Sequence, residues 1–230
     1  MYMKNYKFDA HVHTSEGSAC ACTTGEEIAE AYKEKGYSGI IITDHFFNGN
    51  SSVPRELPWK EKIDLLCKGY ENAKKRGEEI GLTVLFGWEF AYASSDFLTY
   101  GLDRQWLLDN PQIMEMPIWE YADFARQSGG FVVHAHPFRL WGYVNKITLI
   151  PRNIDAVEII NMSNSREENE RAAWYAESYG IPVTAGSDAH NANALPCGGI
   201  ITETEIKTSA DYAEVVKSGN LKLIPKRYED

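Results

Sequence analysis

Short β-rich runs alternate with amphipathic helical stretches along this chain, and this alternation constrains its fold more than any other feature. Such a pattern is typical of a mostly parallel sheet whose strands are connected by helices. Capping-box spacing at two helix starts and a glycine at the end of each support the expected boundaries. Strands are expected at residues 6–10, 37–45, 82–89, 96–103, 130–137, 154–160 and 181–190, and helices at 23–36, 58–81, 117–129 and 165–180.

Length and composition favour one soluble domain over residues 1–230. The formal net charge of −10 argues against an extended nucleic-acid surface, which needs clustered lysine and arginine. The four cysteines show no CxxC pair or secreted disulfide pattern, and no apolar run approaches the length of a membrane span. We therefore expect a cytoplasmic protein without membrane association; the oligomeric state stays open.

All six histidines lie at or just beyond the carboxyl end of an expected strand. In barrels of alternating strands and helices these strand ends meet at one face, where active sites are built. Side chains at i and i+2 of a strand point to the same side, so each His-x-His pair can reach one point. The histidines are His11, His13, His45, His134, His136 and His190.

Carboxylates accompany these histidines at the strand ends. Asp44 precedes His45, Glu89 ends the third expected strand, and Asp188 stands two residues before His190. Imidazole combined with carboxylate suits borderline divalent metals such as Zn, Mn or Fe. Because these donors exceed what one tetrahedral ion requires, we expect a cluster of two or three ions.

Four short motifs in order resemble those of the PHP (polymerase and histidinol phosphatase) superfamily. They are HVH at 11–13, TDH at 43–45, HP at 136–137 and SDAH at 187–190. The resemblance covers nearly the whole chain and implies a distorted seven-stranded (β/α) barrel. It also implies a metal-dependent phosphoesterase that acts on a small phosphorylated metabolite or nucleotide through a metal-activated hydroxide.

The resemblance also implies the metal ligands of three sites. The first would use His11, His13, Glu89 and Asp188, with Glu89 bridging to a second ion held by His136. At the second site, Asp103 in the stretch YGLD replaces a histidine of other members. The third site would use His45 and His190, with Glu16 as the expected partner and Cys20 as the alternative. Catalysis would depend on Asp188, His190 and Glu89, with either His190 or a metal-bound water protonating the leaving group.

Two further residues are candidates for contact with the substrate. Arg139 follows His136 by three residues, and its guanidinium matches the geometry of a phosphate. His134 shares a strand face with His136, so it either bonds the substrate or fills the barrel. Asp9 is a candidate to orient the His11 ring, although a buried structural role is equally compatible with its position. The loop at 46–60 is expected to be mobile and to cover the site.

Alternative functions stay open at this stage. Histidinol-phosphate phosphatase is the alternative within the same chemistry. A non-catalytic metal-binding interaction module and a hydrolase of C–N or other non-phosphate bonds are alternatives of other classes. Activity on phosphate esters, compared with amides or lactones, separates these possibilities.

Overall fold

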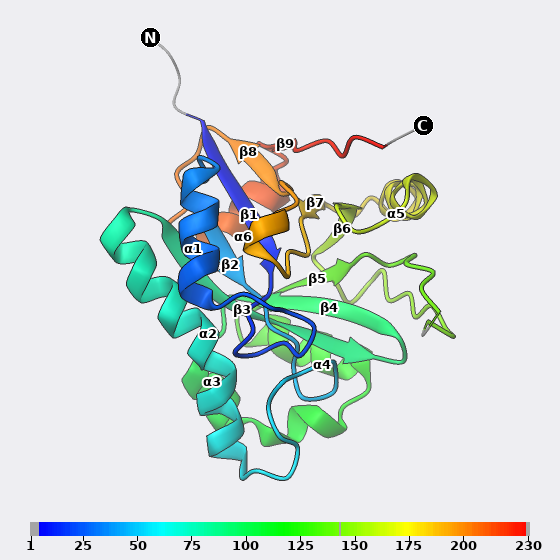
Figure 1. The fold of residues 1–230 in the computed structure, drawn as a ribbon. Helices are drawn as coiled ribbons and strands as arrows, with labels where there is room; N and C mark the ends of the chain where they lie inside the picture. Colours follow the sequence, from blue (N-terminus) through cyan, green and yellow to red (C-terminus); the bar gives the residue numbers. More distant parts are fainter. Residues whose placement is uncertain (1–4, 143, 229–230) are drawn as a thin grey trace.

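The computed structural model describes residues 5–142 and 144–228, which fold into a curved nine-stranded sheet with helices on its outer side (Figure 1). The strand order across the sheet is β7-β6-β5-β4-β3-β2-β1-β8-β9. The strands are β1 (Tyr6–Val12), β2 (Gly39–Ile42), β3 (Thr83–Tyr92), β4 (Ser95–Tyr100), β5 (Phe131–Ala135), β6 (Ala156–Asn161), β7 (Val183–Gly186), β8 (Ile200–Thr202) and β9 (Lys222–Leu223).

The sheet is nearly closed. A parallel bridge between Val12 and Ala189 links the end of β1 to the segment that follows β7. The polypeptide thus surrounds a buried interior at the carboxyl ends of β1, β2, β5, β6 and β7. The expectation of a barrel-like α/β fold is confirmed, but the expected count of seven strands is wrong, because β8 and β9 extend the sheet beyond β1 with antiparallel pairing.

The direction of β4 also differs from a regular (β/α) barrel. No helix separates β3 from β4; they form an antiparallel hairpin in which Glu89 faces Leu98 and Tyr92 faces Ser95. β4 then pairs antiparallel with β5. Therefore β4 begins, rather than ends, at the edge of the sheet where its neighbours end.

The helices cover the outside of the sheet, with α1 and α2 packed together on one side and α5 on another (Figure 1). Both expected capping boxes are present, with Thr24 and Glu27 at α1 and Ser165 and Glu168 at α5. Gly180 ends α5 in the left-handed conformation that glycine adopts without steric cost. The α-helices are α1 (Gly25–Glu34), α2 (Trp59–Ile80), α3 (Arg104–Asp109), α4 (Ile118–Gln127), α5 (Arg166–Tyr179) and α6 (Ser209–Ser218).

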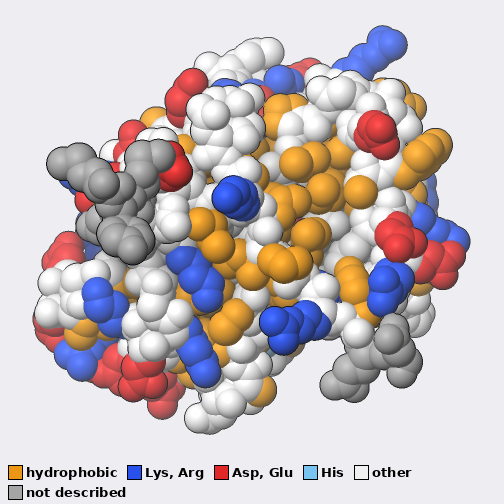
Figure 2. Space-filling view, turned by 90° about the horizontal axis from the view of Figure 1, so that it is seen from above, with side chains coloured by type: hydrophobic (Ala, Val, Ile, Leu, Met, Phe, Trp, Pro, Cys, Tyr) orange, Lys and Arg blue, Asp and Glu red, His pale blue; other side chains and the backbone are white. Residues whose placement is uncertain are grey.

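Two short 3-10 helices, η1 (Pro111–Glu115) and η2 (Ala192–Ala194), complete the described elements. Among the described helices, none has an apolar stretch long enough to cross a bilayer. The end of the molecule at which β1 starts has hydrophobic side chains at its centre, with lysine and arginine around them (Figure 2). Histidine is not visible among the coloured side chains of this face, in keeping with the placement of the histidines at the other strand ends.

Candidate metal centre

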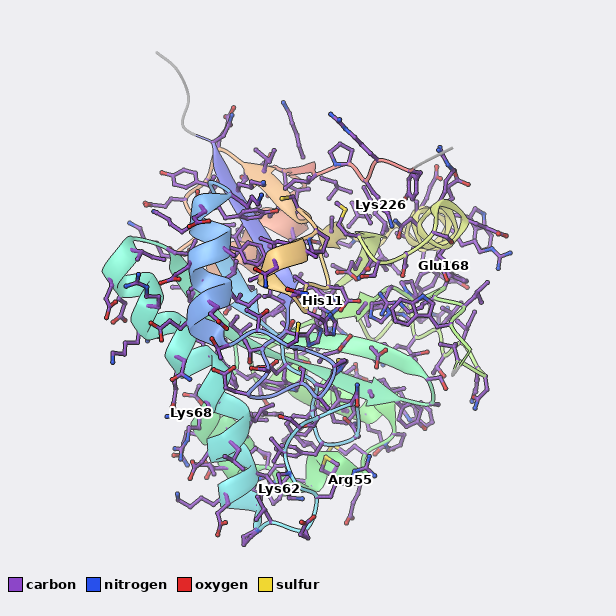
Figure 3. All side chains as sticks on the ribbon, viewed as in Figure 1. His11, Arg55, Lys62, Lys68, Glu168 and Lys226 are labelled. Atoms are coloured by element: carbon purple, nitrogen blue, oxygen red, sulfur yellow. The ribbon has the colours of Figure 1, made fainter. Side chains whose placement is uncertain are left out.

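A cavity of about 450 Å³ opens at the carboxyl ends of the parallel strands. Its floor includes Glu89, Asp96 and Asp188, and its wall includes residues 48–50 of the loop that the sequence placed over the site. His11 lies deep in the middle of the molecule, close to where these strands end (Figure 3). The structure therefore brings together side chains that are up to 179 positions apart in sequence, from His11 to His190.

Four donors form the centre of this site. The Nε2 atoms of His11 and His13 lie 3.1 Å apart. Asp188 Oδ1 lies 3.5 Å from His11 Nε2 and 3.2 Å from His13 Nε2. Glu89 Oε1 lies 3.3 Å from His11 Nε2, and Glu89 Oε2 lies 3.6 Å from His13 Nε2. Ligands bonded to one ion at about 2.1 Å are separated by roughly these distances.

Two further groups of donors adjoin this centre, and the ligand atoms of each lie within 4.8 Å of one another. One consists of Glu89, Asp96 and His136, in which His136 Nε2 lies 3.1 Å from Glu89 Oε1. The other consists of His13, His45 and His190. Glu89 also contacts the group of three histidines, since its Oε2 lies 2.7 Å from His45 Nδ1. Glu89 is thus positioned to bridge neighbouring ions.

Hydrogen bonds on the far side of two rings fix which nitrogen faces the site. His11 Nδ1 lies 3.0 Å from Glu158 Oε1, a carboxylate oxygen that can only accept. His13 Nδ1 lies 3.0 Å from Ser18 Oγ, whose proton goes to Asp44 Oδ1 at 2.7 Å. Nδ1 therefore carries the proton in both rings, and each Nε2 presents a lone pair to the site, as metal-ligating histidines do.

This arrangement is suited to a cation. Two imidazole nitrogens and two carboxylates converge within 3.1–3.6 Å, and without an ion only protonation of one of these groups would give the others a donor. Glu89 Oε2 and His45 Nδ1 are buried and lie 2.7 Å apart, yet neither atom has a hydrogen-bond partner of acceptable geometry. The described residues thus fit borderline divalent metal ions both in donor type and in spacing.

The charges of the site shift its pKa values in opposite directions. Burial lowers the pKa of His11, but Glu158, Asp188 and Glu89 outweigh it and raise that pKa well above its usual value. Burial, reinforced by His45 and His190, lowers the pKa of His13. Burial raises the pKa of Glu89, but His45 and His11 hold it well below its usual range. The Glu89 carboxylate therefore remains charged although it is buried.

Two residues of the site adopt left-handed backbone conformations that are uncommon for residues other than glycine. φ is 30° at His136 and 58° at Asp188. Such conformations carry a cost and persist where the surrounding structure enforces them, commonly at functional sites. Here they turn both side chains from the strand ends toward Glu89 and His11.

Arg139 lines the same cavity and is mostly buried. One of its nitrogens lies 2.6 Å from Asp188 Oδ2 and 3.0 Å from Asn161 Oδ1, and its Nε donates to Asn164 Oδ1 at 3.0 Å. The guanidinium also stacks on Trp141, with 4.3 Å to the ring centroid. Arg139 is therefore held rigidly beside the metal donors, where the sequence placed it.

The structure does not bring Asp103 and Glu16 into the site, so both predictions of ligands are corrected. Asp103 caps α3 by accepting from Trp106 N at 2.8 Å, at the opposite end of the sheet, because β4 runs antiparallel. Asp96, at the start of β4, lies beside Glu89 and His136 instead. Glu16 accepts from Gly25 N at the start of α1 and from Asn72 Nδ2, which occupies its carboxylate.

His134 does not line the cavity. Its ring is fully buried and stacks on Phe97, with centroids 4.4 Å apart, so the barrel-filling reading of this residue fits and the substrate contact does not. Asp9 bonds the backbone of His11 and Ser187 and the hydroxyl of Tyr32, whereas Glu158 orients the His11 ring. Sequence reasoning missed Glu158 because it lies within the run IDAVEII, which gave only a strand signal.

A family model described as PHP-associated matches residues 166–221, a segment that runs from α5 through α6. The match spans less than half of the chain. None of the curated protein sequences matches it significantly.

Solved structures share the fold of this chain at low sequence identity. A two-domain protein from Bacteroides vulgatus, containing a predicted PHP-like metal-dependent phosphoesterase, is 14% identical with a TM-score of 0.70. The match covers 96% of this chain but only 65% of that protein, just under two thirds of its length.

Two other similar structures match over most of both chains. A candidate metal-dependent phosphoesterase from Bifidobacterium adolescentis is 17% identical with a TM-score of 0.58, over 91% of this chain and 95% of that one. An amidohydrolase from Chromobacterium violaceum, solved with bound sulfate and no metal, is 14% identical with a TM-score of 0.61. The match covers 94% of this chain and 98% of that one.

Proposed function

We propose that this chain is a metal-dependent phosphoesterase that hydrolyses a small phosphorylated compound. The observation that carries the proposal is the convergence of the imidazole lone pairs of His11 and His13 with the carboxylates of Glu89 and Asp188 at the floor of an open cavity. Further proposed ligands are Asp96 and His136 at a second position and His45 and His190 at a third. Residues 1–230 form a single PHP domain in this proposal.

Divalent ions bound here would supply Lewis acidity and a hydroxide at neutral pH. The residues of the chain do the positioning. Glu89, between the donor groups, fixes their separation, and the Glu158 and Ser18 contacts hold the His11 and His13 rings in place. Arg139 places a positive charge at the cavity wall that favours a phosphoryl oxygen over a neutral carbonyl.

His190 is the proposed general acid for the leaving group. Its side chain is 27% exposed, more than the other histidines around the cavity, and its Nδ1 donates to the backbone oxygen of Asp188 at 2.8 Å. A group at the mouth of the cavity can receive a proton from solvent and deliver it to a departing alcohol. This placement is also compatible with His190 acting as a metal ligand while a bound water supplies the proton.

Phosphate release tests the proposed function. Protein reconstituted with Mn²⁺ is assayed on sugar phosphates, nucleotides and histidinol phosphate, with amide and lactone substrates alongside. We expect release by the wild type, loss of it in Asp188→Ala, and near-normal rates in Asp103→Ala, an aspartate outside the site. Hydrolysis of amides or lactones alone would contradict the phosphoesterase assignment, and metal binding without any turnover would support an interaction module.

A further inference from the structure

The segment at residues 224–228 follows β9 and runs from the edge of the sheet to the start of α5 (Figure 1). Ile224 N donates to Gly199 O at 2.9 Å, just before β8. Farther along, Tyr228 Oη accepts from Asn169 Nδ2 of α5 at 2.8 Å. This segment is therefore fixed at both of its ends, on the outside of the strands that carry the site.

Lys226, labelled in Figure 3, extends from this segment to the turn between β6 and α5. Its Nζ donates to Met162 O at 2.6 Å and also to Asn164 O. An ammonium group has three donors and no acceptor, so it can bind both carbonyl oxygens at once. Lys226 does not line the cavity itself, yet it holds the backbone of a turn that borders the cavity.

The same turn supplies the amide oxygens that hold Arg139. Asn164 Oδ1 accepts from Arg139 Nε at 3.0 Å, and Asn161 Oδ1 accepts from another nitrogen of the guanidinium at 3.0 Å. Both asparagines are buried. Asn161 Oδ1 also accepts from Ser163 N at 2.8 Å, so its orientation depends on the conformation of the turn. Asn164 therefore joins Lys226 to Arg139, with its backbone oxygen on one and its side-chain oxygen on the other.

We propose that Lys226 is a positioning residue for Arg139. By fixing the turn before α5, it keeps the side-chain oxygens of Asn161 and Asn164 where they orient the guanidinium toward the cavity. Arg139 also donates to Asp188 Oδ2 at 2.6 Å, so a guanidinium released by the amides is free to turn onto that carboxylate. A guanidinium binds a phosphoryl group best when two of its N–H groups point together at the anion. The inference rests on the proposed function, in which Arg139 contacts that group.

Steady-state kinetics of Lys226→Met test the proposal, because methionine keeps much of the length of the side chain and removes the ammonium. KM for the phosphate ester that the wild type hydrolyses fastest should rise by about 2- to 10-fold, the effect of about one net hydrogen bond, with little change in kcat. Lys226→Arg, which can still donate to both carbonyls, should restore KM. Lys222→Met, which alters an exposed lysine on β9, should match the wild type.

A double variant shows whether the lysine acts through the arginine. In the Arg139→Ala background, Lys226→Met should raise KM no further, because the group that it positions is gone. A further rise of the same size as in the wild-type background would overturn the proposal. A fall in kcat at unchanged KM would also overturn it, since it would indicate a structural role alone.

Binding of inorganic phosphate gives a readout that does not depend on turnover. Isothermal titration calorimetry on the Mn²⁺-loaded chain should find a Kd for phosphate that is about 2- to 10-fold higher in Lys226→Met than in the wild type or Lys222→Met. An equal Kd in all three, or no binding by the wild type, would overturn the proposal. A higher Kd in Lys226→Met, with no phosphate ester hydrolysed by the wild type, would instead sustain it while contradicting the proposed function.

Discussion

At the scale of single residues, the site depends on side chains that never face the cavity. Glu158 accepts from His11 Nδ1 through one oxygen, and from His136 N at 3.2 Å and Asn161 Nδ2 at 2.9 Å through the other. Both carboxylate oxygens therefore meet donors. A glutamine side chain at position 158 would place its NH2 group against one of these N–H donors in either orientation of the amide.

Glu158→Gln is accordingly expected to weaken metal binding by about 10- to 100-fold, as loss of such an outer hydrogen-bond partner commonly does. Competition with a chromophoric chelator measures the affinity. Glu177→Gln, on the exposed side of α5, serves as the matched control and should bind metal like the wild type. Equal affinities in the two variants would show that Glu158 does not orient His11.

Asp9 gives a prediction about pH. Burial raises the pKa of Asp9 to about 6. Hydrogen bonds from Ser187, Tyr32 and the His11 backbone lower this pKa, but their effect is smaller than that of burial. A carboxyl with a higher pKa in the folded state takes up protons on folding, so its ionisation makes the folded state less stable as the pH rises from about 4 to above 6.

Asp9→Asn removes this ionisation, and the Tyr32 hydroxyl can then donate to Ser187 Oγ, 2.8 Å away. The free energy of unfolding of metal-free wild type, relative to Asp9→Asn, should fall by about 2 kcal/mol between about pH 4.5 and about pH 7.5. Urea denaturation at the two pH values measures the difference. A constant difference, or one that grows with pH, would contradict the assigned shift.

At the scale of elements, the direction of a strand decides which of its ends carries function. The seven strands expected from the sequence are all present, because hydrophobic runs bounded by turn residues define strands locally. The pairing of β4 depends on contacts distant in sequence, and local patterns do not report them. Local patterns therefore predict a ligand at Asp103, at the end of β4, and give no sign of Asp96, at its start.

The directions of the strands also explain where the six histidines lie. Five of the six histidines meet at the cavity because β1, β2, β5 and β7 all end there, as the alternating pattern predicts. The His134 ring contacts Phe97 and Tyr175 in the core, which fits the barrel-filling alternative that the sequence leaves open. The last segment described, with β8, α6 and β9, carries no motif, so local patterns predict nothing about it.

The start of α5 links helix capping to the cavity wall. Glu168 accepts from Ser165 N at 2.7 Å in the capping box and, through its other oxygen, from Leu140 N at 2.6 Å. Leu140 follows Arg139 directly, so Glu168, labelled in Figure 3, helps to hold the segment that carries this arginine. Ser165 shares the cap without contacting that segment in its described bonds.

Ser165→Ala and Glu168→Ala should each lower the free energy of unfolding by about 1 kcal/mol through loss of the cap. Only Glu168→Ala should also raise KM for the phosphorylated substrate, because it alone releases the backbone beside Arg139. Denaturant unfolding and steady-state kinetics on both variants check this. A rise in KM of the same size in Ser165→Ala would attribute the effect to the helix itself.

At the scale of the whole molecule, a metal cluster that joins β1, β3, β5 and β7 should stabilise the fold. Removing the ions leaves buried carboxylates and lone pairs in mutual contact. An ion at 100 times its Kd stabilises the folded state by about 2.7 kcal/mol, which corresponds to about 5–10 °C in Tm for a chain of this size.

Chelator treatment of the wild type should therefore lower Tm by about that amount, and added Zn²⁺ or Mn²⁺ should restore it. Asp188→Ala should respond much less to both treatments, while Asp103→Ala should behave like the wild type. Differential scanning calorimetry measures these shifts. A Tm unaffected by chelator in the wild type would mean that the cluster binds no ion tightly.

The number of metal ions bound per chain tests the central claim most directly. After reconstitution and removal of free metal, elemental analysis by mass spectrometry should find two or three equivalents in the wild type and in Asp103→Ala. His11→Ala, which removes a donor from the centre of the cluster, should bind fewer. Finding one equivalent or fewer in the wild type would contradict the account of this cavity as a multinuclear metal centre.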